Sequence, residues 1–186
     1  MRKLLYQGLY FLLLVFLLPS CEFRCNLGEQ NEKKVRQANR PVIKDGGNTV
    51  IYNGIELEAH LVKVTKAYLV FNDGERVPDN NVVDFTKPVK MIVFVDSGWT
   101  VNDSQVLLGA SEKVTNDAGR VLLSEKDLFA KSHTRSIPAE DARIISLTVT
   151  LTLTSKSERG FVTISFTIWD KMGSGYVRGQ YRLYTN

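Results

Sequence analysis

The sequence predicts an all-β fold: an antiparallel β-sandwich, jelly-roll or immunoglobulin-like, of roughly eight strands. Three observations predict it. Apolar and polar residues alternate with period two over most of the chain after Asn48, a pattern typical of half-buried strands. Turn residues interrupt this alternation about every 8 to 12 residues. No long stretch has the helical period, and no repeat or linker divides residues 48–186, which we therefore expect to form one domain.

The three C-terminal stretches alternate most regularly. They are predicted as strands over residues 144–154, 161–170 and 176–185. The residues expected to face the core are Ile145, Leu147, Val149, Leu151 and Leu153, then Val162, Ile164, Phe166 and Ile168, then Val177, Tyr181 and Leu183. Because short polar connections join these stretches, we expect a single three-stranded antiparallel meander.

The first half of the domain is also predicted to be β. Residues 49–52 form one expected strand, and 55–70 form another with a bulge, because its apolar parity switches near Val62. Residues 89–95 are apolar on both faces, which indicates a central strand covered on both sides. Residues 106–114 and 120–124 flank Asn116-Asp117-Ala118-Gly119, whose closing Gly119 suits a type I turn with a left-handed fourth residue.

The N-terminus has the parts of a secretion signal. Arg2 and Lys3 precede an apolar stretch, 4–18, and Pro19-Ser20-Cys21 follows it. The stretch is shorter than the ~20 residues that a membrane-crossing helix needs, and Pro19 would end a helix there. Residues 1–20 are therefore predicted to be a cleaved signal peptide.

Leu18-Pro19-Ser20-Cys21 resembles the bacterial lipobox, in which an aliphatic residue and a small residue precede an invariant cysteine. The resemblance implies that the Cys21 thiol takes a diacylglycerol, that a peptidase cuts before it, and that its amine can be acylated. Pro19 departs from the residues usual at its position. Because two or three acyl chains hold a protein firmly to a bilayer, we expect the mature protein to stay on a membrane through its N-terminal lipid.

Residues 21–47 are predicted to be a lipidated flexible tether, because residues 22–44 are mostly polar and charged. Without Arg2 and Lys3 the chain retains 22 basic residues against 20 acidic ones, a net charge of +2, which is not typical of nucleic-acid binding. With Cys21 lipidated, Cys25 is the one remaining thiol, so no internal disulfide is expected.

Motifs for catalysis are not found. No serine lies in a nucleophile elbow, and no glycine loop that binds phosphate follows a strand, so we predict no catalytic residue, metal or cofactor. Glu56, Glu58 and His60 share one strand face, but steps of about 6.6 Å are too wide for one ion to bind all three. Carboxylates from several loops leave a hydrolase open as an alternative.

A candidate binding surface lies on the outer face of the predicted C-terminal sheet. The candidate binding residues are Trp169, Tyr176, Arg178, Arg182 and Tyr184, and Phe161 and Gln180 share their face. Exposed aromatic rings beside guanidinium groups can stack on a sugar or anchor a protein partner. Trp169 and Tyr176 flank the Gly173-Ser174-Gly175 turn and are expected to be neighbours. The alternative is a solvated, threonine-rich face whose aromatics are covered by loops.

The signal, the tether and the all-β domain together resemble the small lipid-anchored envelope proteins of Bacteroides-like bacteria. These proteins are uncharacterised, so the resemblance carries over no functional residue beyond Cys21. Our first hypothesis is a non-catalytic binding or scaffolding module for a glycan or an envelope protein. An envelope hydrolase, and a carrier of an apolar ligand in a cavity lined by the inward residues, are the alternatives. Glu22-Phe23-Arg24 resembles neither the aspartate signal for inner-membrane retention nor an acidic surface-export run, which favours the periplasmic side of the outer membrane.

Overall fold

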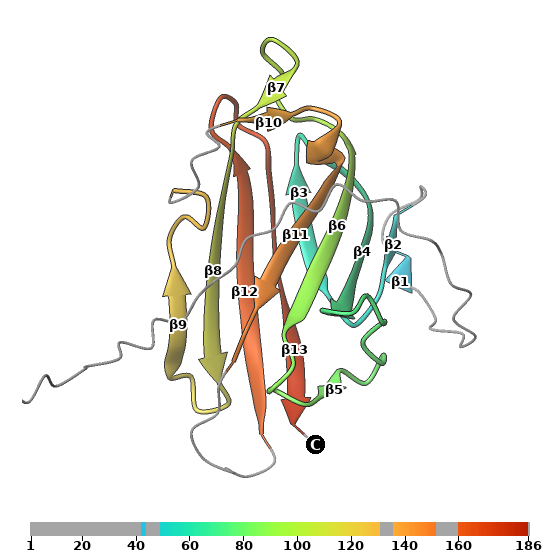
Figure 1. Cartoon of the computed structure of the whole chain (residues 1–186), viewed down its shortest axis with the longest axis vertical. Helices are drawn as coiled ribbons and strands as arrows, with labels where there is room; N and C mark the ends of the chain where they lie inside the picture. Colours follow the sequence, from blue (N-terminus) through green and yellow to red (C-terminus); the bar gives the residue numbers. More distant parts are fainter. Residues whose placement is uncertain (1–41, 44–48, 131–135, 152–159, 186) are drawn as a thin grey trace, which may run out of the picture.

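The computed structural model describes residues 42–43, 49–130, 136–151 and 160–185 (Figure 1). Within these ranges the protein consists of two main β-sheets packed face to face, a two-stranded ribbon and one short 3-10 helix. Eight strands have five or more residues, and the rest have two. The predicted all-β sandwich is confirmed.

Sheet A contains five strands. Their order is β1 (Val42–Ile43), β2 (Val50–Ile51), β4 (Lys63–Phe71), β6 (Val89–Ser97) and β11 (Ile144–Val149). The strand predicted to be central, β6, lies between β4 and β11. Its inner residues are buried, and on its outer face Ile92 is buried while Lys90 and Phe94 are half-buried. β1 belongs to the segment predicted to be tether, so the sheet begins before residue 48.

Sheet B contains six strands. Its order is β3 (Glu56–His60), β13 (Tyr176–Thr185), β12 (Phe161–Asp170), β8 (Leu108–Asn116) and β9 (Val121–Glu125), and β5 (Val82–Val83) pairs in parallel with the end of β13. The ribbon of β7 (Gln105–Val106) and β10 (Ile137–Pro138) and the 3-10 helix η1 (Asp141–Arg143) lie at one end of the sandwich (Figure 1). The turn between β8 and β9 has the predicted left-handed glycine, with Gly119 at φ 77°.

The core fills the space between the two sheets. Every described residue predicted to face inward on the C-terminal strands is buried except Leu151, which is half-buried. Leu153 lies outside the described residues. Trp99, after β6, packs against the core, and its Nε1 donates a hydrogen bond to the Ala142 carbonyl oxygen at 3.3 Å. Trp99 therefore closes one end of the sandwich.

Two strand predictions were wrong. Residues 55–70 form two strands in different sheets, β3 and β4, and the break falls at Leu61, whose φ is 58°. The apolar parity switches there because the chain crosses from sheet B to sheet A. The C-terminal meander is also incorrect: β11 ends at Val149 and pairs with β6 in sheet A, so β12 has β8 as its second neighbour.

Residues 1–41 lie outside the described residues, and with them the predicted signal peptide, Cys21, Cys25 and most of the predicted tether. Residues 152–154 of the predicted strand 144–154 are also outside. In the part of the chain that the structure describes, no helix is long and apolar enough to cross a membrane.

Candidate functional site

The outer face of sheet B is built around the β12–β13 hairpin. The two strands pair in register along their length, so Trp169 lies opposite Tyr176 and Phe161 lies opposite Tyr184. Residues of β12 alternate between buried and half-buried positions. We call the outward residues of this hairpin the outer strip. Its members are Phe161, Thr163, Ser165, Thr167 and Trp169 on β12, and Tyr176, Arg178, Gln180, Arg182 and Tyr184 on β13.

Asp170 holds the turn that ends the hairpin. Its Oδ1 accepts hydrogen bonds from the backbone N–H groups of Met172 and Gly173, and its Oδ2 accepts one from the N–H of Thr100. Burial disfavours the ionised carboxylate, but these donors outweigh that effect and lower the pKa of Asp170 below its ordinary value. This network fixes the turn and therefore the relative position of Trp169 and Tyr176.

At the turn end of the outer strip, three rings lie in one row across neighbouring strands. Trp169 pairs with Gly109 of β8 on one side and with Tyr176 on the other, and Tyr176 pairs with His60 of β3. The rings of His60 and Tyr176 are stacked, with centroids 5.3 Å apart. A Cβ atom at position 109 would overlap the Trp169 indole. Glycine thus leaves room for the indole against β8.

Glu58 of β3 organises the next row. Its carboxylate accepts hydrogen bonds from Nε and Nη2 of Arg178 at 2.9–3.0 Å and from the Tyr176 hydroxyl at 2.9 Å. The Arg178 and Tyr176 hydrogen bonds lower the pKa of Glu58, and the bond to Glu58 raises the pKa of Tyr176. Arg178 is therefore held in place and its charge is matched, while both side chains of the pair remain about half exposed.

The opposite end of the outer strip has a second aromatic pair. The Phe161 and Tyr184 rings are tilted, with centroids 5.9 Å apart, and the guanidinium of Arg182 lies 5.1 Å from the centre of the Phe161 ring. The Tyr184 N–H donates to the Asn81 carbonyl oxygen. Within the described ranges Arg182 has no carboxylate partner, in contrast to Arg178.

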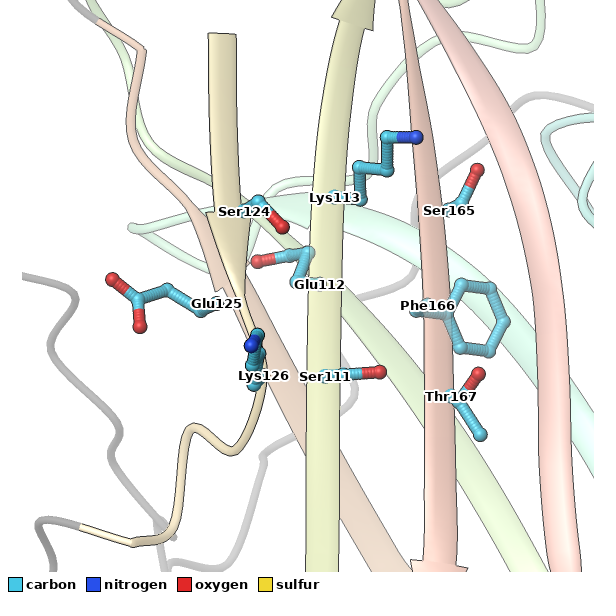
Figure 2. Close-up of a pocket in the computed structure, with 9 residues that line it drawn as sticks. All are labelled: Ser111, Glu112, Lys113, Ser124, Glu125, Lys126, Ser165, Phe166 and Thr167. Atoms are coloured by element: carbon cyan, nitrogen blue, oxygen red, sulfur yellow. The ribbon is translucent and has the colours of Figure 1, made fainter. Parts of the chain in front are cut away.

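Two hollows adjoin the outer strip. The first, of about 410 Å³, lies over β8, β9 and β12, and Figure 2 shows the residues that line it. They are Ser111, Glu112, Lys113, Ser124, Glu125, Lys126, Ser165, Phe166 and Thr167. Hydroxyl and charged groups dominate this lining, and Ser165 and Thr167 belong to the outer strip itself.

The second hollow, of about 400 Å³, lies beside the far half of β13. Gln180, Arg182 and Tyr184 of the outer strip line it together with Glu56 and other polar residues. The remaining lining residues are Asn53, Gly54, Asp79, Asn80, Asn81 and Tyr181. Such a mixture of donors and acceptors around an aromatic ring suits a ligand rich in hydroxyl groups.

The inner face of the same sheet contains a buried acid. Glu112 of β8 is 2% exposed, and neither of its carboxyl oxygens has a hydrogen-bond partner among the described residues. Burial raises the pKa of Glu112 to about 8. Tyr181, also buried, has an unpartnered hydroxyl within the same ranges, and its pKa is raised by burial and by Glu112. Burial therefore favours the neutral form of Glu112.

The structure places all five sequence-predicted binding residues on one face, but at the two ends of the outer strip. Trp169, Tyr176 and Arg178 lie together at the turn end, and Arg182 and Tyr184 at the other. The sequence interpretation missed Gly109, Glu58 and His60 as their neighbours, because no local pattern reports which distant strand pairs with β13. The burial of Glu112 could have been predicted from the sequence, because Glu112 has the same strand parity as Leu108, Ala110 and Val114.

Glu56, Glu58 and His60 point outward along β3, as their shared parity predicted. Glu56 accepts a hydrogen bond from Gln180 Nε2 at 2.7 Å, and Glu58 binds Arg178. Among the described residues, no group of three or more histidine, cysteine, aspartate or glutamate side chains is placed to hold a metal ion.

Comparisons with known proteins give distant likenesses. No family model matches the chain, and no curated protein is similar in sequence. A crystal structure of the C-terminal domain of wzt is similar at a TM-score of 0.43 with 9% identity, covering 72% of this chain and 78% of that one. The X-ray structure of the Northeast Structural Genomics Consortium target SoR45 is similar at a TM-score of 0.30 with 11% identity, covering 72% and 88%. Neither likeness bears on what this chain binds.

Proposed function

We propose that this protein is a lipid-anchored component of the bacterial cell envelope whose β-sandwich binds a glycan, without catalysis, through the outer face of sheet B. The observation that supports binding most directly is the row of Trp169, Tyr176 and His60, with Arg178 and Glu58 fixed beside it. Aromatic rings held in fixed positions and flanked by hydrogen-bonding groups suit the apolar face and hydroxyl edge of a sugar.

The preorganisation of this row favours binding over a merely solvated strand face. Gly109 makes room for the indole, Tyr176 is fixed by its stacking on His60 and its bond to Glu58, and Arg178 is held by two donors to Glu58. Side chains already ordered in the free protein lose little entropy on binding. A protein partner remains the alternative occupant of this face.

The glycan proposal is tested with a printed panel of neutral and uronic-acid oligosaccharides probed with the full chain in detergent. We expect captured ligands to be lost with Trp169→Ala and retained with Phe94→Ala. Phe94 is a matched control because it is a half-buried aromatic on the outer face of sheet A. Equal capture by wild type and Trp169→Ala would contradict the proposal.

The membrane anchor is supported by the Leu18-Pro19-Ser20-Cys21 sequence, and the outer membrane, facing the periplasm, is the proposed location. Cells fed a clickable fatty acid should label the wild type and Cys25→Ser but not Cys21→Ser. Labelling of Cys21→Ser at the wild-type level would exclude lipidation at this cysteine.

A hydrolase is the second candidate, favoured by one observation. Glu112 and Glu125 lie directly opposite each other on β8 and β9 and both line the first hollow. A pair of carboxyl groups is what glycoside hydrolysis needs. However, both Glu112 oxygens are buried, so a substrate in the hollow does not reach them. The hydrolase would be preferred over the non-catalytic module if the wild type released shorter products from a bound oligosaccharide and Glu125→Gln did not.

A further inference from the structure

The outer strip has nearly the same order of residue types from either end. Along β13 it is Tyr176, Arg178, Gln180, Arg182 and Tyr184, so an aromatic ring and an arginine stand at each end of a central amide. On β12, Phe161 and Trp169 stand at the ends, and only threonine and serine lie between them. The hairpin therefore presents two similar aromatic pairs separated by a polar middle.

The geometry at the two ends is also alike. Arg178 lies 5.2 Å from the centre of the Tyr176 ring, and Arg182 lies 5.1 Å from the centre of the Phe161 ring. Each arginine thus covers one ring of its pair and places guanidinium donors beside it. At a rise of about 3.3 Å per residue, Tyr176 and Tyr184 are ~26 Å apart along the strand. This distance is longer than a single small ligand and matches a ligand that is an extended chain of several units.

The charges around the strip balance. Lys113, Lys126, Arg178 and Arg182 are matched in number by Glu56, Glu58, Asp79 and the half-buried Glu125, all of them residues of the strip, its neighbouring strand or the adjoining hollows. A site for a polyanion would have an excess of basic groups. The first hollow flanks the strip with hydroxyl groups, and the second flanks it with amides and carboxylates. All of these groups can form hydrogen bonds with the neutral hydroxyl groups of a ligand.

We infer that the ligand is a linear, neutral polysaccharide that lies along β12–β13 and occupies two aromatic subsites, one at Trp169 and Tyr176 and one at Phe161 and Tyr184. This inference rests on the proposed glycan-binding function and adds to it the class of glycan, its direction on the sheet and the number of subsites. The central polar residues contact the sugar units between the two subsites.

Titration calorimetry of the full chain in detergent tests the inference. The probes are neutral oligosaccharides of a linkage captured on the panel, graded in length from the disaccharide upward, together with uronic-acid oligosaccharides of the same lengths. We expect each protein chain to bind two disaccharides but only one long oligosaccharide. The long oligosaccharide should bind about tenfold or more tightly than the disaccharide, because its contact with the second subsite is intramolecular once the first is occupied. Trp169→Ala and Tyr184→Ala should each reduce the disaccharide count to one and remove the gain with length.

Tyr184→Phe keeps the ring and should keep both properties, whereas Phe94→Ala should behave as wild type. A disaccharide count of one in the wild type, or an affinity independent of length, would overturn the two-subsite inference and leave the proposed function intact. Tighter binding of uronic-acid chains than of neutral ones would overturn the neutral-ligand assignment. Failure of every oligosaccharide to bind would instead overturn the proposed function itself.

Discussion

The two faces of sheet B are formed by the same strands but differ in burial and in side-chain chemistry. On β12 the inward residues Val162, Ile164, Phe166 and Ile168 are buried in the core, while the residues between them form the outer strip. The inner face contains one acid, Glu112, without a hydrogen-bond partner among the described residues, whereas the acids of the outer face are bonded to Arg178 and Gln180. Stability should therefore depend on the inner face, and recognition on the outer one.

The largest expected effect is the pH dependence that Glu112 produces. Its pKa rises from 4.5 to about 8 on folding, so the folded state binds its proton more tightly than the unfolded state. The contribution of Glu112 to the free energy of unfolding is then largest below about pH 4.5, falls as the pH rises to about 8, and is lost above it, a change of ~5 kcal/mol at most. Asp170, whose pKa is lowered, contributes only in the acid range.

Urea denaturation at about pH 5 and about pH 9 measures this effect. Glu112→Gln keeps the shape without the ionisation, so its stability should hardly change between these conditions and should exceed the wild type at the higher pH. If the wild type and Glu112→Gln lost the same amount of stability between about pH 5 and about pH 9, a group other than Glu112 would cause the pH dependence.

The second prediction concerns packing on the inner face. Ile164 is fully buried in the centre of β12, so Ile164→Ala should lower the free energy of unfolding by about 2–5 kcal/mol. Thr163→Ala, its neighbour on the outer face, is the matched control and should change it by no more than about 0.5 kcal/mol. Similar losses for both would mean that the two faces are not distinct in energy.

The third prediction concerns the outer face of sheet B and uses Gly109→Ala. The added Cβ overlaps the Trp169 indole, so the ring must move off β8, which should cost no more stability than removing the ring does, about 1 kcal/mol. We expect oligosaccharide binding to weaken although every aromatic side chain is still present. Unchanged binding, measured by calorimetry, would show that the position of the indole does not matter.

Face assignments were predictable because alternation is local. The inward residues of β12 and β13 were identified from the sequence, and the residues of the outer strip follow from them. Strand partners were not predictable in the same way, because β11 alternates like β12 yet pairs in the other sheet. The crossing at Leu61 has the same sequence pattern as a bulge, since a left-handed φ at a leucine has no local indication. The neighbours of Trp169 and Arg178 depend on those pairings.

The central claim is that Trp169 serves recognition and not the core. Its most direct test is to measure, on the same preparations of wild type and Trp169→Ala, both the oligosaccharide Kd and the free energy of unfolding. We predict a loss of binding of ~1–3 kcal/mol, roughly 5- to 150-fold in Kd, with a loss of stability of about 1 kcal/mol or less. An unchanged Kd, or a stability loss of several kcal/mol, would contradict the account, because the indole would then be part of the core rather than of a binding surface.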